Sequence, residues 1–203
     1  MIFPLVARAL ARTLAATPLL LGALGAPLAA QDYPPLVIEG RAGAAMPVRS
    51  FRTGPDAGGA IERAPSFGLH FVYRGPSGWG PYIGFSQHRF DCARDGCPGA
   101  EYVATAWDTG MQRTLGRTGP AWIRLGVAFA RVERDFATPD GPRRGTSMLS
   151  LGLQAGAGVR VPIRGRLSLT PGARYEWLNT QFRDGPLVRM RWLTADLGVA
   201  LGF

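Results

Sequence analysis

Two residues of this chain have the types and the spacing that a hydrolytic site needs. Ser86 and His88 stand two apart, and residues two apart on a β-strand point to the same side. A serine becomes a nucleophile when a histidine takes its proton and a third group orients that histidine. The nearest acid, Asp91, has the opposite parity. The pair is therefore an incomplete catalytic site, and we favour a structural role for His88 near one end of a strand.

A second group of polar residues occupies alternate positions of several predicted strands, which would place all of them on one face of the sheet. The group predicted for this face comprises Glu39, Arg41, His70, Asp108, Arg124, Gln154, Arg174, Glu176 and Asp196. Charges of both signs that face a narrow interior should pair, because an unpaired buried charge costs several kcal/mol. We favour a salt-bridge plug. The alternative is a polar lumen that conducts or binds a solute, because the same face is also rich in Gly and Ala.

The two cysteines, Cys92 and Cys97, are separated by four residues of a polar link. Two cysteines alone do not make a zinc site, because structural zinc takes four ligands. A local disulfide that fixes the shape of the link is the better interpretation. We expect no metal and no cofactor.

The charge balance is strongly basic, at +9 formal charges, and the chain contains no lysine. Several arginines fall in the longer links between predicted strands: Arg49, Arg52, Arg63, Arg143, Arg144, Arg183 and Arg189. A guanidinium fork suits phosphate, because it binds two oxygens at once. A phosphate-binding rim and a merely solvated loop surface both remain open from the sequence.

These residues need strands to position them, and the last eleven residues give the clearest one. From Leu193 to Phe203, one parity is entirely apolar, and the other is small or polar. That two-residue period predicts a strand with one apolar face.

Similar alternation, of uneven strength, recurs along the chain. The predicted strands are about Leu36 to Val48, Ser66 to Arg74, Pro81 to Phe90, about Tyr102 to Arg113, Ala121 to Glu133, Leu149 to Val161, Leu167 to Trp177 and Leu193 to Phe203. The first and the fourth have the weakest patterns. Pro171 lacks an N–H group, so we expect a bulge or a lost ladder bond there.

Short Gly/Pro links alternate with longer polar links between these strands, as in barrels with short periplasmic turns and long outer loops. The sequence therefore predicts an all-β, eight-stranded antiparallel transmembrane β-barrel. Its architecture resembles the small eight-stranded bacterial outer-membrane barrels of the OmpA and OmpX type. The apolar alternation of the last strand, Leu197, Val199, Leu201 and the terminal Phe203, resembles the signal that the barrel assembly machinery reads.

The first thirty residues have the plan of a secretory signal. Arg8 and Arg12 precede an apolar run, and small residues follow at Ala26, Ala29 and Ala30. We expect cleavage near Ala30, which divides the chain into a signal peptide (1–30) and a barrel domain (31–203). We therefore expect export to the bacterial outer membrane. The expected partners are outer-membrane lipids, lipopolysaccharide and the barrel assembly machinery. We expect a monomer that binds no nucleic acid.

Four functions are consistent with this barrel. The first is a non-enzymatic surface protein that anchors extracellular loops for envelope integrity, lipid contact or adhesion, and we favour it. The second is a narrow pore or small-solute binder. The third is a lipid-modifying hydrolase that uses Ser86 and His88. The fourth is a soluble, lipocalin-like barrel whose apolar face points inward.

Overall fold

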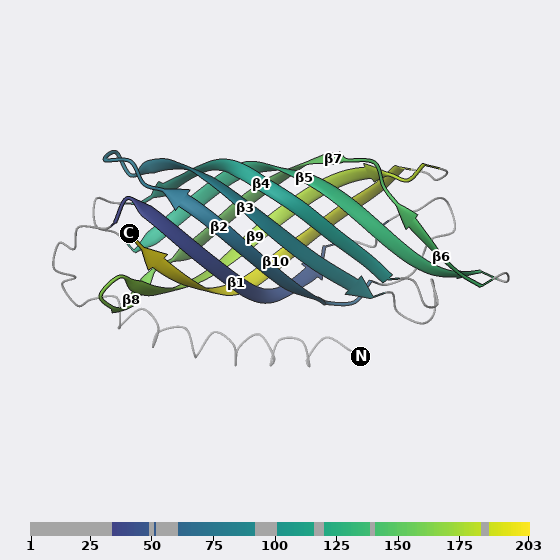
Figure 1. Ribbon diagram of the computed structural model, residues 1–203, viewed down its shortest axis with the longest axis horizontal. Coiled ribbons are helices and arrows are strands. Elements are labelled where there is room, and N and C mark those ends of the chain that lie inside the picture. The colour runs from purple at the N-terminus through teal and green to yellow at the C-terminus, as the bar shows by residue number, and fades with distance from the viewer. Residues whose placement is uncertain are drawn as a thin grey trace, which may run out of the picture. The chain divides into compact units, whose positions relative to one another are not determined.

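Ten β-strands make up the described part of the chain, which is residues 34–48, 51, 61–91, 101–115, 120–138, 141–183 and 187–203 of a computed structural model. The strands are β1 (Leu36–Pro47), β2 (Ala64–Tyr73), β3 (Trp79–Asp91), β4 (Glu101–Thr114), β5 (Ala121–Thr138), β6 (Gly141–Thr146), β7 (Ser150–Val159), β8 (Val161–Arg164), β9 (Leu167–Gln181) and β10 (Leu187–Gly202). Figure 1 shows them tilted around a common axis. Within these residues, no helix is long and apolar enough to cross a membrane.

Eight of the strands close into an antiparallel barrel in the order β1-β2-β3-β4-β5-β7-β9-β10. The ring is completed between the first and last strands, where Val37 lies opposite Gly202 and Pro47 lies opposite Trp192. β6 pairs only with the far end of β5, and the short β8 continues the line of β7 along β9. The structure therefore confirms the predicted fold class of an all-β, eight-stranded antiparallel barrel.

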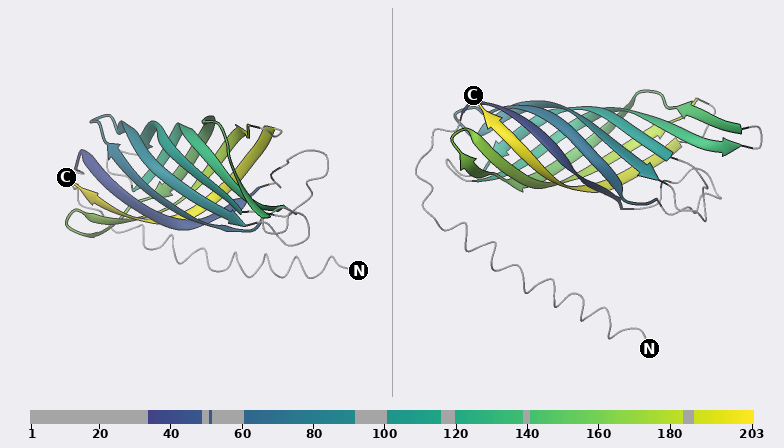
Figure 2. Two further views of the ribbon diagram at one scale, coloured as in Figure 1. Left: turned by 45° about the vertical axis from the view of Figure 1, so that its right-hand side comes forward. Right: turned by 60° about the horizontal axis from the view of Figure 1, so that its bottom comes forward.

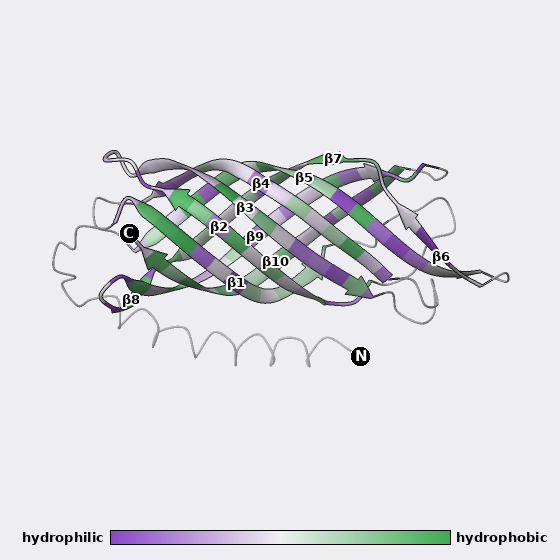
Figure 3. Cartoon of the chain, in the orientation of Figure 1, coloured by the Kyte–Doolittle hydropathy of each residue, from purple (hydrophilic) through white to green (hydrophobic). Residues whose placement is uncertain are grey.

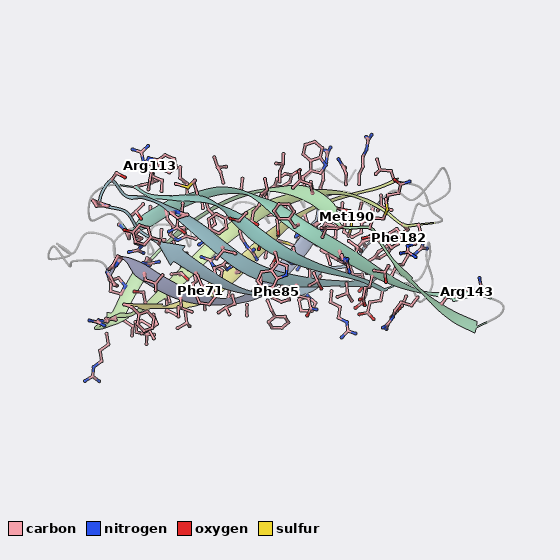
Figure 4. All side chains as sticks on the ribbon, turned by 45° about the horizontal axis from the view of Figure 1, so that its top comes forward. Phe71, Phe85, Arg113, Arg143, Phe182 and Met190 are labelled. Atoms are coloured by element: carbon pink, nitrogen blue, oxygen red, sulfur yellow. The ribbon has the colours of Figure 1, made fainter. Side chains whose placement is uncertain are left out.

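The two ends of the barrel differ. β8 and the C-terminus lie at one end, and β5 and β6 project from the other as a two-stranded ribbon, which Figure 2 shows from two further sides. The short links after β2 and around β8 lie at the C-terminal end. Figure 4 labels Arg113 at the first end and Arg143 at the second.

The outer surface of the barrel is apolar, which is the reverse of a soluble protein. Trp107, Leu125 and Leu151 are each about 60% exposed, whereas His70 on the opposite parity is fully buried. Figure 3 shows hydrophobic segments alternating with polar ones along the strands. Because the apolar parity points outward, the lipocalin-like alternative, which needs it to point inward, is contradicted.

The strand predictions differ from the structure in several places, including the ends of β5 and β9, which continue to Thr138 and Gln181. The predicted strand from Leu149 to Val161 is divided into β7 and β8 at Arg160. Opposite this break stands Pro171, and the ladder on that side of β9 stops at Gly172 and resumes at Leu169. The expected loss of ladder bonds at Pro171 is therefore observed on the side of β9 that faces β7 and β8. On the other side, the pairing of β9 with β10 continues through Pro171. The last strand also begins earlier than predicted, and β6 was not predicted.

Some predictions fall outside the described residues. The disulfide between Cys92 and Cys97, the signal peptide (1–30), and the rim arginines Arg49 and Arg52 all lie there. They stay predictions.

Candidate functional site in the barrel interior

Side chains from all eight barrel strands fill the interior, where they form an ion-pair layer, a large apolar layer and a small apolar cluster of Val37, Val72, Tyr82 and Ala200. The ion-pair layer consists of Glu39, Arg41, His70, Tyr82, Asp108, Gln112, Trp122, Arg124, Arg174 and Asp196. The apolar layer, toward the ribbon end, consists of Phe51, Phe90, Tyr102, Val132, Leu178, Val188, Met190, Trp192 and the alanines packed with them. His88 and Glu176 lie beside the apolar layer.

Glu39 on β1 joins two arginines of the ion-pair layer. Its Oε1 accepts a hydrogen bond from Arg41 Nη2 at 2.9 Å, and its Oε2 accepts one from Arg124 Nη2 at 3.0 Å. Arg124 also donates to Oε1 of Gln112 from Nη2 at 2.7 Å and from Nε at 3.1 Å. The carboxylate thus bridges β1 to β5, on the other side of the barrel.

Asp196 on β10 extends the same network around the wall. It accepts hydrogen bonds from Arg41 and, at 3.1 Å, from Nε of Arg174. Nη1 of Arg174 lies 4.0 Å from Oδ2 of Asp108, and Nε2 of His70 lies 3.6 Å from that same oxygen. Each carboxylate in the layer therefore faces at least one basic side chain, as burial of charge requires.

Aromatic rings separate and support the guanidinium groups. Arg124 lies over the Tyr82 ring at 4.5 Å from its centroid and over the Trp122 ring at 5.0 Å. Arg41 lies over the same Trp122 ring at 4.8 Å. A guanidinium over an aromatic face gains electrostatic attraction from the ring, more so when both are desolvated.

Glycines on the inner face do not leave open space, because larger side chains from neighbouring strands occupy it. A Cβ at Gly84 would lie 2.2 Å from Cδ2 of His70, and one at Gly126 would lie 2.1 Å from the Tyr82 hydroxyl. The small residues in the sequence therefore make room for the ring side chains of the plug. This geometry favours the salt-bridge plug over the open polar lumen.

His88 and Glu176 form a separate pair above the ion-pair layer. Nε2 of His88 lies 3.3 Å from Oε2 of Glu176. That oxygen also accepts hydrogen bonds from Trp192 Nε1 at 2.7 Å and from Thr194 Oγ1 at 3.3 Å. The His88 ring packs on Phe90 and Trp192. Glu176, and not Asp91, is therefore the carboxylate that faces this histidine.

A small cavity adjoins this pair. Its wall is lined mostly by small and apolar residues of β4, β5, β7, β9 and β10, with His88 and Glu176 as its polar members. It has room for about one water molecule. A larger solute does not fit without movement of side chains.

The structure places all nine predicted interior residues on the inner face, where each is at most 8% exposed. Seven of them join the ion-pair layer, and Glu176 pairs with His88. Gln154 is buried, but its side-chain amide has no hydrogen-bond partner within the described residues. Ser86 and His88 are also buried, and the Ser86 hydroxyl has no partner there either.

Sequence reasoning missed several contributors to the interior, among them Tyr82, Gln112 and Trp192. Gln112 lies four residues after Asp108 on the same parity, so its inward position was available from the pattern. The aromatic residues were not identified because apolar side chains at inward positions carry no charge signal.

Comparison with known proteins identifies the fold of this chain but finds no sequence family. No protein-family model and no curated protein matches the chain. Among solved structures, Neisserial surface protein A (NspA) aligns with a TM-score of 0.57 and 15% identity, over 83% of this chain and 96% of that one. OprG from Pseudomonas aeruginosa gives 0.54 and 12%, over 83% and 96%. Ail, the attachment invasion locus protein of Yersinia pestis, gives 0.52 and 14%, over 82% and 97%. The fold is that of the small eight-stranded outer-membrane barrels.

Proposed function

We propose that this protein is a non-enzymatic outer-membrane barrel that carries extracellular loops and the β5–β6 ribbon on a sealed support. The observation that carries the proposal is the filled interior. Glu39 and Asp196 tie arginines from three strands together across the lumen. An eight-stranded barrel has room for side chains and little more. The ribbon and the extracellular loops are then the part of the molecule available to partners, for envelope integrity, lipid contact or adhesion.

Placement in the bacterial outer membrane is supported by the apolar outer surface and by the fold of the three similar structures. A closed barrel crosses a bilayer because every strand pairs with two neighbours and leaves no free edge. The short-turn end then faces the periplasm, and the ribbon faces outward. We infer that a cleaved signal peptide delivers the chain to this membrane.

Conductance tests the sealed interior. In planar bilayers, the wild-type barrel should give a flat current trace at all voltages, because the ion-pair layer fills the lumen. An R124A/R174A double variant removes two plug side chains and serves as the comparison. Stepwise openings of the wild-type protein would contradict the proposal.

A narrow pore or small-solute binder is the second candidate, and the cavity beside His88 and Glu176 favours it. Wild-type openings in the conductance experiment would support this candidate directly. A flat wild-type trace together with openings of the double variant would leave the sealed support as the function of the barrel.

A lipid-modifying hydrolase fits the geometry poorly. Ser86 and His88 point into the interior and are at most 1% exposed. A bilayer lipid contacts the outer surface of a barrel, so its ester groups lie on the other side of the wall from these two residues.

A further inference from the structure

The outward face of β9 and β10 carries basic side chains directly above an apolar stripe. On β10, the outward side chains from Leu193 to Phe203 are all apolar. They span about 33 Å along the strand, or about 25 Å along the barrel axis after tilt, which matches the apolar band of an outer-membrane barrel. Arg191 and Arg189 are the next two outward positions, so they lie at the height of lipid headgroups.

These arginines form a defined cluster with two residues of β9. Arg191 lies opposite Trp177 in the β9–β10 ladder, and Arg189 lies opposite Asn179. The Arg191 guanidinium lies over the Trp177 ring, 5.1 Å from its centroid. Nε1 of Trp177 donates a hydrogen bond to Oδ1 of Asn179 at 3.2 Å, which holds the ring in place. Stacking leaves the N–H edges of the guanidinium available to an anion. We call these four residues the β9–β10 cluster.

Two other arginines at the described outer rim, Arg89 and Arg144, are each neutralised by a carboxylate, unlike those of this cluster. On β3 and β4, Arg89 pairs with Glu101. On the ribbon, Arg144 donates to both carboxylate oxygens of Asp135, at 2.8 and 3.0 Å, and lowers the pKa of that carboxyl. The outward residues of β9 and β10 near the cluster include no acid among those that the structure describes. Within the described part of the chain, these two guanidinium groups therefore stand close together without a carboxylate partner.

We propose that the β9–β10 cluster binds the phosphate groups of a phosphorylated glycolipid in the outer leaflet. The single outward face of β10 offers an apolar stripe for acyl chains and, above it, two arginines for the headgroup. Each guanidinium donates to two phosphate oxygens, and Asn179 adds an amide. An amphiphile matches both parts of this surface, whereas a free phosphate matches only the arginines.

Direct binding measurements test this assignment on the full barrel in detergent micelles. The probes are lipid A with its two phosphates and the same lipid A with both phosphates removed, and native mass spectrometry gives the dissociation constants. We expect the phosphorylated form to bind about tenfold more tightly or better to the wild-type protein. In an R189Q/R191Q variant, this preference should disappear.

The matched control is R89Q/R144Q, which removes the same charge from arginines that already have carboxylate partners. We expect its affinity to stay within about twofold of wild type, because exposed pairs contribute little. Heat-dependent mobility on gels establishes that both variants are folded barrels. Equal losses in the two variants, or equal binding of the two lipids to the wild type, would overturn the proposal.

Inorganic phosphate is a third probe, and we expect it not to displace phosphorylated lipid A at equal concentration. Complete displacement would assign the cluster to a free anion and overturn the lipid assignment. The inference rests on the proposed outer-membrane placement. It is separable from the sealed lumen, because a conducting wild-type barrel would contradict the sealed support and leave these affinities unchanged.

Discussion

Glu39 links two buried guanidinium groups directly. Its two carboxylate oxygens each accept a hydrogen bond from a different arginine, and its side chain is 1% exposed. Arg41 and Arg124 are equally buried. Removal of the carboxylate leaves Arg124 with the neutral Gln112 as its hydrogen-bond partner in this layer.

We therefore expect Glu39→Ala to lower the free energy of unfolding by about 3–5 kcal/mol, the cost of breaking a buried ion pair on one side. Urea unfolding of the barrel from lipid vesicles measures this quantity. Asp135→Ala is the control, because Asp135 pairs with Arg144 at the exposed ribbon, where little change is expected. Equal effects of the two substitutions would show that burial does not govern this network.

His88 gives a second test at the scale of single residues. His88→Ala should leave the lipid A and phospholipid profiles of expressing cells unchanged, because the imidazole points away from the bilayer. It should lower stability by about 1–3 kcal/mol, since Glu176 loses one of its partners. Mass spectrometry of extracted lipids checks the first expectation. A deacylated species that appears with wild type and vanishes with the variant would restore the hydrolase hypothesis.

The sequence predicted which polar residues face inward, because parity alone decides that. It did not predict their pairings. The Glu39–Arg124 contact joins residues 85 positions apart, and its formation depends on barrel closure and rotamers that no local pattern contains. The partner of His88 was missed for the same reason, since Glu176 approaches it from β9 across the interior.

At the scale of elements, strand faces were predictable wherever large apolar residues alternate with small or polar ones. The weak fourth pattern still forms β4, because Thr105 and Thr109 are tolerated among its outward side chains. The division of the sixth predicted strand was not anticipated. Its cause lies on the facing strand, where Pro171 cannot donate to the ladder.

Gly126 on β5 tests the packing of strands against the plug. A Cβ there would lie 2.1 Å from the Tyr82 hydroxyl and 2.4 Å from the Thr109 carbonyl oxygen. We expect Gly126→Val to lower the free energy of unfolding by about 1–3 kcal/mol through overpacking. Gly40→Val is the control, because a Cβ at Gly40 meets no atom within 4 Å. A comparable loss of unfolding free energy in both variants would show that the change in strand propensity, and not the clash, causes the effect.

At the scale of the whole molecule, closure depends on the pairing of β1 with β10. The ladder extends to the last residue, where the Phe203 N–H donates to the Leu36 carbonyl at 2.8 Å. The Phe203 side chain is 47% exposed on the outer surface and takes no part in the plug. Its contribution to the fold is therefore chiefly through its backbone.

Phe203→Ser should separate folding from assembly in cells. The backbone bond to Leu36 is kept, so refolding into detergent micelles should match wild type. Insertion into the outer membrane should fall, because the side chain that we expect the assembly machinery to read is gone. Fractionation and gel mobility measure the two quantities, with Leu187→Ser, at the other end of β10, as control. Normal insertion of the Phe203 variant would remove this residue from the assembly signal.

The ribbon has a mechanical consequence. β5 runs without interruption from the barrel wall into the ribbon, and within the wall it is bonded to β4 on one side and to β7 on the other. A pull along β5 from outside loads both ladders in shear, so many hydrogen bonds must yield together. The same pull along β6 loads only its ladder with β5 within the described ribbon. The projection would thus resist more force through β5 than through β6.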